Sequence, residues 1–141
     1  MGEIGLNQFA PYLLNRFVAD WNADLAGVLR GLGVTTTQFR ALSVLAVASG
    51  ITVNDLAVYA VTEQSTMSRT LDGLEEQGFI RRKPKSDDMR AREVYITEEG
   101  LALFAGLWPQ VYRLYADAFA GLDEGEFRGF VATLQKLMRG R

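Results

Sequence analysis

The stretch TEQSTMSRTLDGLEEQGFIRRKPKSDDMRAREVYITEEG, which runs from Thr62 to Gly100, decides the fold of this chain. Its first part repeats apolar residues at helical spacing with polar residues between them, which predicts an amphipathic helix. The apolar stripe consists of Met67, Leu71 and Leu74. Gly78 is the expected end of this helix, because glycine readily adopts the left-handed conformation that closes a helix. Residues 79–83 and 92–96 then favour two short strands with Pro84 and a polar run between them. The stretch therefore predicts a helix followed by a basic β-hairpin.

The residues before this stretch predict three helices. Residues 6–29 have the apolar spacing of a long helix, in which Pro11 introduces a kink or marks the true start. Thr35 and Gln38 have the spacing of a capping box at the start of a second helix. Thr52 is the expected cap of a short third helix.

Further caps and breaks are expected from Thr62 onward. Thr62 is predicted to cap the fourth helix and Thr97 the fifth. Pro109 is expected to kink or divide the fifth helix, because proline has no N–H to donate to the preceding turn. Asp123 with Glu126 is predicted to cap the last helix. The terminal helices have apolar faces and no separate domain to cover them, so a partner subunit is the expected cover.

Composition removes several classes of function. The chain has 141 residues, no cysteine and no histidine, which excludes disulfides, thiolate and imidazole catalysis and the usual ligands of zinc. The adjacent carboxylates at 75–76 and 98–99 point about 100° apart on a helix, so they do not converge as acid–base catalysis requires. We therefore expect no enzyme, no cofactor and no metal. The early glutamate and the lack of a long apolar run predict a cytoplasmic protein without a membrane span.

The charge is unevenly distributed. The formal net charge is -2, yet residues 81–92 hold six cations against Asp87 and Asp88, which gives this segment +4 and leaves -6 for the rest. Such polarity would direct the hairpin toward DNA and turn the acidic body away from it. A solvated loop is the plainer alternative.

The exposed face of the fourth helix has side chains suited to the major groove. A helix of this size fits that groove, and residues near its N-terminus reach base edges. The candidates are Gln64, Ser65, Thr66, Ser68 and Arg69. Arg69 is suited to a bidentate contact with guanine or to a phosphate. An ordinary exposed helix face remains the alternative for the helix taken alone.

The hairpin adds a second basic surface at a fixed offset from this helix. Its candidate DNA-binding cations are Arg81, Lys83, Lys85, Arg90 and Arg92, with Arg82 in the same run. Arg90 lies near the tip and is the candidate for insertion into the minor groove. Asp88 is expected to pair with an arginine and stiffen the loop, with an ordinary surface pair as the alternative.

Several motifs in this order resemble the multiple antibiotic resistance regulator (MarR/SlyA) family of bacterial transcription factors. The similar segments are Leu74-Glu75-Glu76-Gln77-Gly78-Phe79-Ile80-Arg81-Arg82, Asp88-Met89-Arg90-Ala91 and Ile96-Thr97-Glu98-Glu99-Gly100. Thr35-x-x-Gln38-Phe39 with Leu42, Val53-x-x-Leu56-Ala57, and Ser65-Thr66-Met67-Ser68-Arg69 with Leu71 resemble the second, third and recognition helices of the family. The motifs cover residues 34–100.

The resemblance implies a winged helix-turn-helix homodimer, joined through its terminal helices, that binds a palindromic operator in double-stranded DNA. It also implies that Arg90 is the wing arginine, that Asp88 is its structural aspartate, and that Thr35 belongs to the DNA-binding set. Met89 departs from the family pattern, where many members have a basic residue, which implies weaker binding to the minor groove.

The resemblance further implies a small aromatic anion as effector, held between the dimerisation helices and the DNA-binding core. Aromatic side chains and one cation in these regions are suited to such a cavity. The candidates are Tyr12, Phe17, Trp21, Arg40, Trp108, Tyr112 and Tyr115. Aromatic residues at helical spacing also serve as ordinary core or dimer interface, which is the competing interpretation.

The predicted fold class is mainly α with a small β-hairpin wing. We expect an N-terminal dimerisation helix at 1–32, a winged helix-turn-helix core at 33–100 and C-terminal dimerisation helices at 101–141, in one continuous structural domain. The expected function is a homodimeric repressor released by an aromatic, phenolic or carboxylate ligand. A protein-interaction module without an effector and an activator of the same fold are the alternatives.

Overall fold

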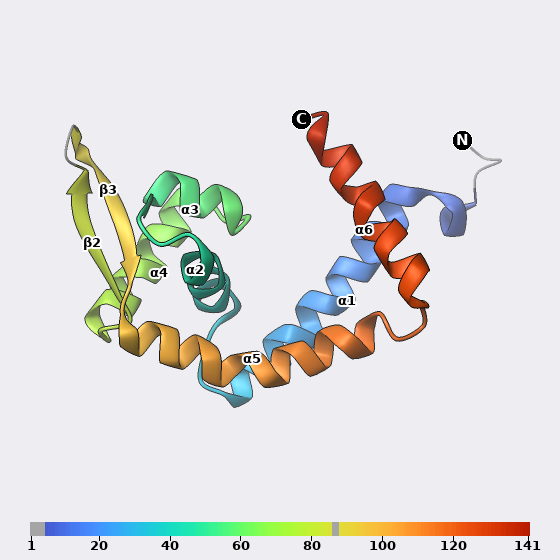
Figure 1. Ribbon diagram of the computed structural model, residues 1–141, viewed down its shortest axis with the longest axis horizontal. Helices are drawn as coiled ribbons and strands as arrows, with labels where there is room; N and C mark the ends of the chain where they lie inside the picture. Colours follow the sequence, from blue (N-terminus) through green and yellow to red (C-terminus); the bar gives the residue numbers. More distant parts are fainter. Residues whose placement is uncertain (1–4, 86–87) are drawn as a thin grey trace.

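The structure is a computed structural model that describes residues 5–85 and 88–141, with the side chains at 88–90 outside the description. Figure 1 shows a body of short helices and a hairpin at one end, and long helices that extend away from it. The elements are η1 (Leu6–Gln8), α1 (Ala10–Gly31), α2 (Thr36–Val47), β1 (Ile51–Thr52), α3 (Val53–Tyr59), α4 (Gln64–Glu76), β2 (Ile80–Lys85), β3 (Asp88–Ile96), α5 (Glu98–Ala118) and α6 (Glu124–Arg139). The predicted fold class, mainly α with a hairpin wing, is confirmed.

Most of the predicted helix caps are present. Thr35 with Gln38 and Asp123 with Glu126 form complete capping boxes, in which side chain and backbone bond in both directions. Thr52 and Thr97 each accept a hydrogen bond from the backbone three residues on. These caps fix where α2, α3, α5 and α6 begin.

The prediction for Thr62 is wrong. The N-cap of α4 is Glu63, whose side chain makes no capping hydrogen bond. The Thr62 hydroxyl instead donates to the carbonyl of Ala60 at 3.1 Å, and its N–H donates to Ala57 at 2.9 Å. Thr62 therefore helps to close α3, and it lies one residue before the N-cap of α4.

The two helix prolines behave differently from one another. Pro11 lies in the first turn of α1, where its missing N–H costs nothing, so it marks the start of the helix. Pro109 lies inside α5, which continues from Glu98 to Ala118 without division. Leu107 and Val111 are buried on either side of it, and their packing holds the helix together across the lost hydrogen bond.

The hairpin is part of a three-stranded antiparallel sheet in the order β1-β3-β2. β2 and β3 pair from Ile80 with Ile96 outward, and an irregularity at Pro84 and Lys85 shifts the register near the tip. Both strands are longer than predicted. β1 was not predicted, because two residues are too short to show a strand pattern.

Two clusters of buried side chains form the core. The first seats α2, α3 and α4 on the sheet and contains Leu42, Leu45, Leu56, Met67, Leu71, Leu74, Ile80 and Val94. The second joins the last turns of α1 to α2 and to the middle of α5, through Leu25, Leu29, Val34, Phe39, Leu107 and Val111. The first cluster thus positions α4 and the hairpin, and the second attaches them to the long helices.

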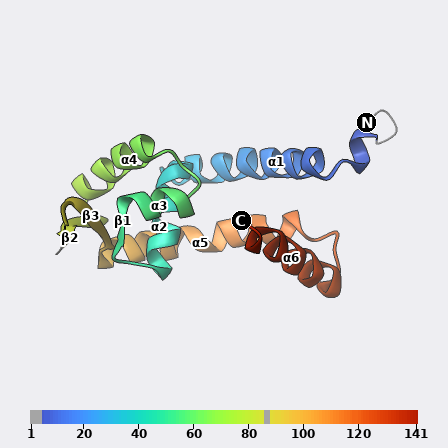
Figure 2. The same cartoon turned by 90° about the horizontal axis from the view of Figure 1, so that it is seen from above.

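The long helices leave much apolar surface uncovered in one protomer. Figure 2 shows α1 and the α5–α6 pair as two arms that extend from the body. All residues of α6 are described, and none of them is buried. Exposed apolar side chains on the arms include Leu13, Phe17, Val18, Leu122, Leu137 and Met138. Across residues 5–85 and 88–141, no helix has both the length and the apolar content that crossing a bilayer requires.

Candidate nucleic-acid interface

The fourth helix is seated by its apolar stripe and closed by a glycine. Met67, Leu71 and Leu74 are fully buried, as their spacing predicted. Gly78 has a φ of 84°, and the Phe79 N–H donates to the Leu74 carbonyl at 2.9 Å. These are the features of a Schellman motif, which ends α4 and turns the chain directly into β2.

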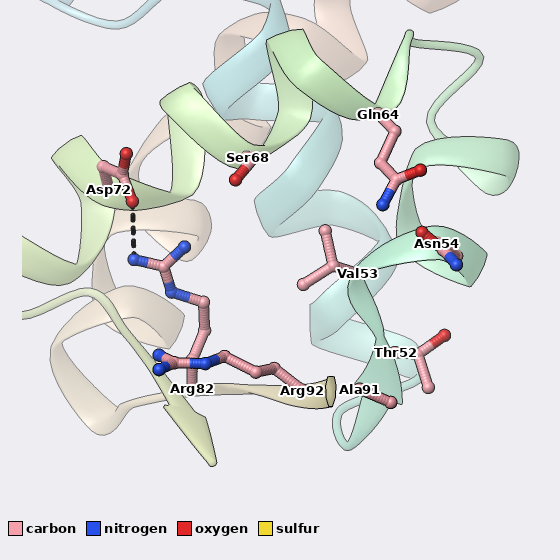
Figure 3. A pocket seen from close by; sticks show the side chains of 9 residues that line it. All are labelled: Thr52, Val53, Asn54, Gln64, Ser68, Asp72, Arg82, Ala91 and Arg92. Atoms are coloured by element: carbon pink, nitrogen blue, oxygen red, sulfur yellow. Dashed lines mark hydrogen bonds and ion pairs between the residues drawn. The ribbon is translucent and has the colours of Figure 1, made fainter. Parts of the chain in front are cut away.

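The polar face of α4 borders a hollow of about 390 Å³ between α3, α4 and the sheet, here called the α3–α4 hollow (Figure 3). Its lining residues are Thr52, Val53, Asn54, Gln64, Ser68, Asp72, Arg82, Ala91 and Arg92. Gln64 and Ser68 extend into it from α4, opposite Asn54 at the start of α3. The hollow therefore brings together polar groups from α3, α4 and all three strands.

The remaining candidates on α4 lie beside this hollow. Ser65 and Arg69 are exposed and Thr66 is half-buried. The Arg69 guanidinium makes only a long contact, 3.5 Å, to the Thr66 hydroxyl, so it can move to another partner at little cost.

Arg82 anchors the hairpin to α4. Its guanidinium donates to Asp72 Oδ1 at 2.7 Å and to Glu75 Oε1 at 2.8 Å and 3.0 Å, and its backbone N–H donates to Glu75 Oε2 at 3.1 Å. The Arg82 side chain is only 13% exposed. The guanidinium thus binds two carboxylates of α4, and it fixes the hairpin relative to that helix.

The ion pairs change the acid–base properties of both partners. Burial alone raises the pKa of Glu75, but the hydrogen bonds from Arg82 outweigh it and hold that pKa below its ordinary value. Burial lowers the pKa of Arg82, and the hydrogen bonds to Asp72 and Glu75 outweigh that and raise it. Sequence reasoning counted Arg82 only among the basic residues of the hairpin. The available signal was strand alternation, which places Arg82 on the same face as buried Ile80.

The same alternation separates the other hairpin cations. Arg81 and Lys83 pair across the strands with Tyr95 and Glu93, on the face of the sheet opposite to α4. The Lys83 ammonium lies 5.1 Å from the centre of the Tyr95 ring. Arg81 and Lys83 therefore do not line the α3–α4 hollow, whereas Arg92 does.

The last candidates of the DNA-binding set lie elsewhere. Lys85 is half-buried beside the irregularity in β2. Thr35 caps α2 and lines a separate hollow with Arg30 and Val34, away from α4. The backbone of Asp88 and Arg90 belongs to β3, but their side chains lie outside the described residues.

A second hollow, of about 650 Å³, lies between α1, α2 and the turn that follows α3, and is here called the α1–α2 hollow. It is lined by Val18, Trp21, Asn22, Leu25, Phe39, Arg40, Ser43, Val44, Tyr59, Ala60 and Val61. Of the predicted effector residues, Trp21 and Arg40 line it. The Arg40 guanidinium donates to Asn22 Oδ1 at 3.0 Å, which holds this cation at the wall of an otherwise largely apolar space.

The other predicted effector residues are not brought into this hollow. Trp108, Tyr112 and Tyr115 belong to an aromatic row along α5, with ring centres 6.1 Å apart from one residue to the next. Phe17 packs on Phe119 at 5.1 Å, and the Tyr12 hydroxyl accepts a hydrogen bond from Arg16. Successive turns of α1 meet different neighbours, so residues on one face of this helix do not share one cavity.

A helix that is seated by its apolar stripe and followed at once by an anchored β-hairpin defines a winged helix-turn-helix protein. The model of the MarR family matches residues 32–91. A MarR family transcriptional regulator from Silicibacter pomeroyi is 38% identical and superposes with a TM-score of 0.91, over 99% of this chain and 94% of that one. The chain belongs to the MarR family of transcriptional regulators.

Two further relatives are informative. The HTH-type transcriptional repressor IacR of Pseudomonas putida is 23% identical over 124 residues, which cover 88% of this chain and 74% of that protein. A MarR family protein of Mycobacterium tuberculosis, solved in complex with salicylic acid, is 28% identical with a TM-score of 0.73, over 90% of this chain and 94% of that one.

Proposed function

We propose that this chain is a homodimeric repressor that binds a palindromic DNA operator and is released by a small aromatic carboxylate. The observation that carries the DNA-binding part is the polar face of α4 beside a hairpin that Arg82 holds in place. Gln64, Ser68 and Arg69 are then presented to the major groove, and Arg92 with the hairpin tip reaches the neighbouring backbone and minor groove.

A dimer is supported by the apolar surface on both arms. Exposed apolar patches of this kind mark interfaces, and a two-fold dimer presents two recognition helices to two half-sites about one DNA turn apart. The related protein in Pseudomonas putida supports repression as the direction of control. In vitro transcription from a promoter that contains the operator distinguishes repression from activation, since a repressor would lower the transcript yield and an activator would raise it.

The DNA-binding proposal is tested with duplexes selected from a random pool. We expect Arg69→Ala to weaken binding to the selected duplex by about 1–3 kcal/mol more than binding to random DNA, because base contacts carry the discrimination. Equal losses on both duplexes would make Arg69 a phosphate contact. Binding should also fall steeply with salt, since phosphate contacts release counterions, whereas a protein-interaction module would show no such slope.

The effector proposal rests on the α1–α2 hollow. An aromatic ring fits its apolar walls, and a carboxylate fits Arg40 beside Asn22. The relative solved with salicylic acid supports this ligand class.

Sodium salicylate should raise the unfolding midpoint of the protein, because a ligand that binds only the folded state adds about 2.7 kcal/mol at a hundred times its Kd. Arg40→Met should remove most of this shift. Arg30→Met is the matched control, since Arg30 lines a different hollow. A shift that survives Arg40→Met would place the ligand elsewhere.

A further inference from the structure

The turn between α3 and α4 has an unusual backbone conformation. Val61 has a φ of 53°, in the left-handed region. In the described part of the chain, every other residue with positive φ is a glycine, at positions 33, 50 and 78. A β-branched side chain is strongly disfavoured in this region, because its Cβ crowds the following carbonyl oxygen.

The hydrogen bonds around Val61 show why the conformation is held. The Val61 N–H donates to Val58 at 3.1 Å, and the Thr62 N–H donates to Ala57 at 2.9 Å. This pair of bonds is a complete Schellman motif, with Val61 at the position that glycine usually takes. Turns of helix-turn-helix units also commonly contain glycine. A valine here lowers the population of the required conformation by roughly 5- to 30-fold relative to an unstrained residue.

Burial does not offset this cost in the described part of the chain. The Val61 side chain is 83% exposed, so its methyl groups gain little from packing. Val61 does line the α1–α2 hollow, together with Tyr59, Ala60, Trp21 and Arg40. A molecule in that hollow would cover Val61.

The same turn determines where the recognition helix begins. Val61 is separated from Gln64, the first residue of α4, by Thr62 and Glu63 only. Glu63 makes no side-chain cap, so the first turn of α4 has no such bond to hold it independently of the turn. Gln64 in turn lines the α3–α4 hollow. Val61 therefore lines the α1–α2 hollow, and Gln64, three residues further on, lines the α3–α4 hollow.

We propose that the Val61 turn is a strained hinge that couples the α1–α2 hollow to the recognition helix. The proposal rests on the effector function proposed above. The ring of an aromatic carboxylate packs on the Val61 side chain while its carboxylate binds Arg40, and this contact holds the turn and thereby biases the position of α4. The ligand changes DNA affinity only to the extent that it binds the two positions of α4 differently.

Two substitutions at one position separate strain from contact. Val61→Gly removes both the backbone strain and the side chain, whereas Val61→Ala removes the side-chain contact and retains a residue that disfavours positive φ. Val58→Ala is the matched control, because Val58 is also exposed but lies within α3 and outside the hollow.

The first measurements need no ligand. We expect Val61→Gly, but not Val61→Ala, to raise the unfolding midpoint. Val58→Ala should change the midpoint only through the higher helix propensity of alanine and should leave the exchange of the Thr62 amide unchanged. We also expect Val61→Gly to slow hydrogen exchange by about five-fold or more, because the unstrained turn opens less often. The slowed amides should be that of Thr62 and the first hydrogen-bonded amides of α4. A midpoint and exchange rates equal to those of the wild type would refute the hinge, whatever salicylate does.

The second measurements use sodium salicylate and the selected duplex. Both Val61 variants should bind salicylate more weakly, by roughly four-fold for each methyl group that the ligand covers, and salicylate should change their DNA affinity less than it changes that of the wild type. Unaltered salicylate affinity and coupling in both variants would refute the link through Val61. If the wild type binds no salicylate while Val61→Gly still slows exchange, the hinge stands and the effector assignment falls.

Discussion

At the scale of single residues, Arg82 shows how one side chain can join the two elements of the candidate nucleic-acid interface. Its guanidinium bonds to Asp72 and Glu75 on α4 while its backbone belongs to β2. A flexible side chain held by two carboxylates is stiffer than one in a single ion pair, so the angle between helix and hairpin is defined before DNA arrives.

The Glu75 ion pair should make stability depend on pH in the acidic range. The folded pKa of Glu75 lies below its ordinary value of 4.5, so its contribution is complete above that value and is lost as pH falls through the folded pKa. We expect the free energy of unfolding of the wild type to exceed that of Glu75→Gln at neutral pH, and the difference to shrink as the pH falls below 4.5. Denaturant titrations at a fixed protein concentration measure this difference. A difference that does not change with pH would show that the charge on Glu75 contributes nothing.

Residue types predicted local contacts better than distant ones. The caps at Thr35, Thr52 and Asp123 were predictable because capping bonds span only three residues of sequence. The role of Arg82 was not predicted, because its partner Asp72 lies ten residues away and on another element. The valine at a glycine position in the α3–α4 turn went unnoticed for a related reason, since φ at Val61 follows from how α3 must end.

At the scale of elements, Gly100 explains why the motif after β3 contains a glycine. It is the third residue of α5, and a Cβ there would overlap the backbone carbonyl oxygen of Phe79 and crowd the Ile96 side chain. Thr97 caps the helix at the same place and also donates to the Gly78 carbonyl at 2.7 Å. The start of α5 is therefore packed against the end of α4 and the base of the hairpin.

Gly100→Ala should destabilise the protein by about 1–3 kcal/mol, because the added methyl group meets backbone that cannot move aside cheaply. Gly106→Ala is the matched control on the same helix. A Cβ at Gly106 meets nothing within 4 Å, so this change should stabilise the protein by about 0.5–1 kcal/mol through helix propensity. Thermal or denaturant unfolding measures both. Equal effects of the two substitutions would contradict the close approach of α5 to Phe79.

Elements were predicted well where an apolar pattern repeats over several helical turns. They were predicted poorly where the element forms only through pairing with a distant segment. The stripe Met67, Leu71 and Leu74 gave α4 directly. β1 exists only because Ile51 and Thr52 lie beside Val94 and Glu93, which no local pattern reveals. The residues predicted for an effector site lie together only in part for the same reason. Trp21 and Arg40 meet across two helices, whereas the aromatic row on α5 runs in another direction.

At the scale of the whole molecule, the body buries its apolar side chains within one protomer, whereas the arms leave many of theirs exposed. The body closes its own core around α4 and the sheet. The arms expose apolar residues along α1 and α6, and α6 contacts its own protomer mainly through aromatic residues such as Phe127 and Phe130 on Phe119. In the proposed dimer, replacing an exposed apolar residue of an arm should therefore perturb a partner contact while leaving the fold of the protomer intact.

Leu137→Glu should convert the dimer to a monomer and weaken binding to the selected duplex, because one protomer contacts only one half-site. Leu137 is 63% exposed on α6, so a glutamate there costs the protomer little but places a charge in the expected interface. Val47→Glu is the matched control, since Val47 is 87% exposed at the end of α2, outside the arms. Sedimentation velocity should show monomers for Leu137→Glu and dimers for Val47→Glu. If both variants stay dimeric, the last turns of α6 lie outside the interface. If Leu137→Glu becomes monomeric and keeps full operator affinity, a single protomer is sufficient for recognition.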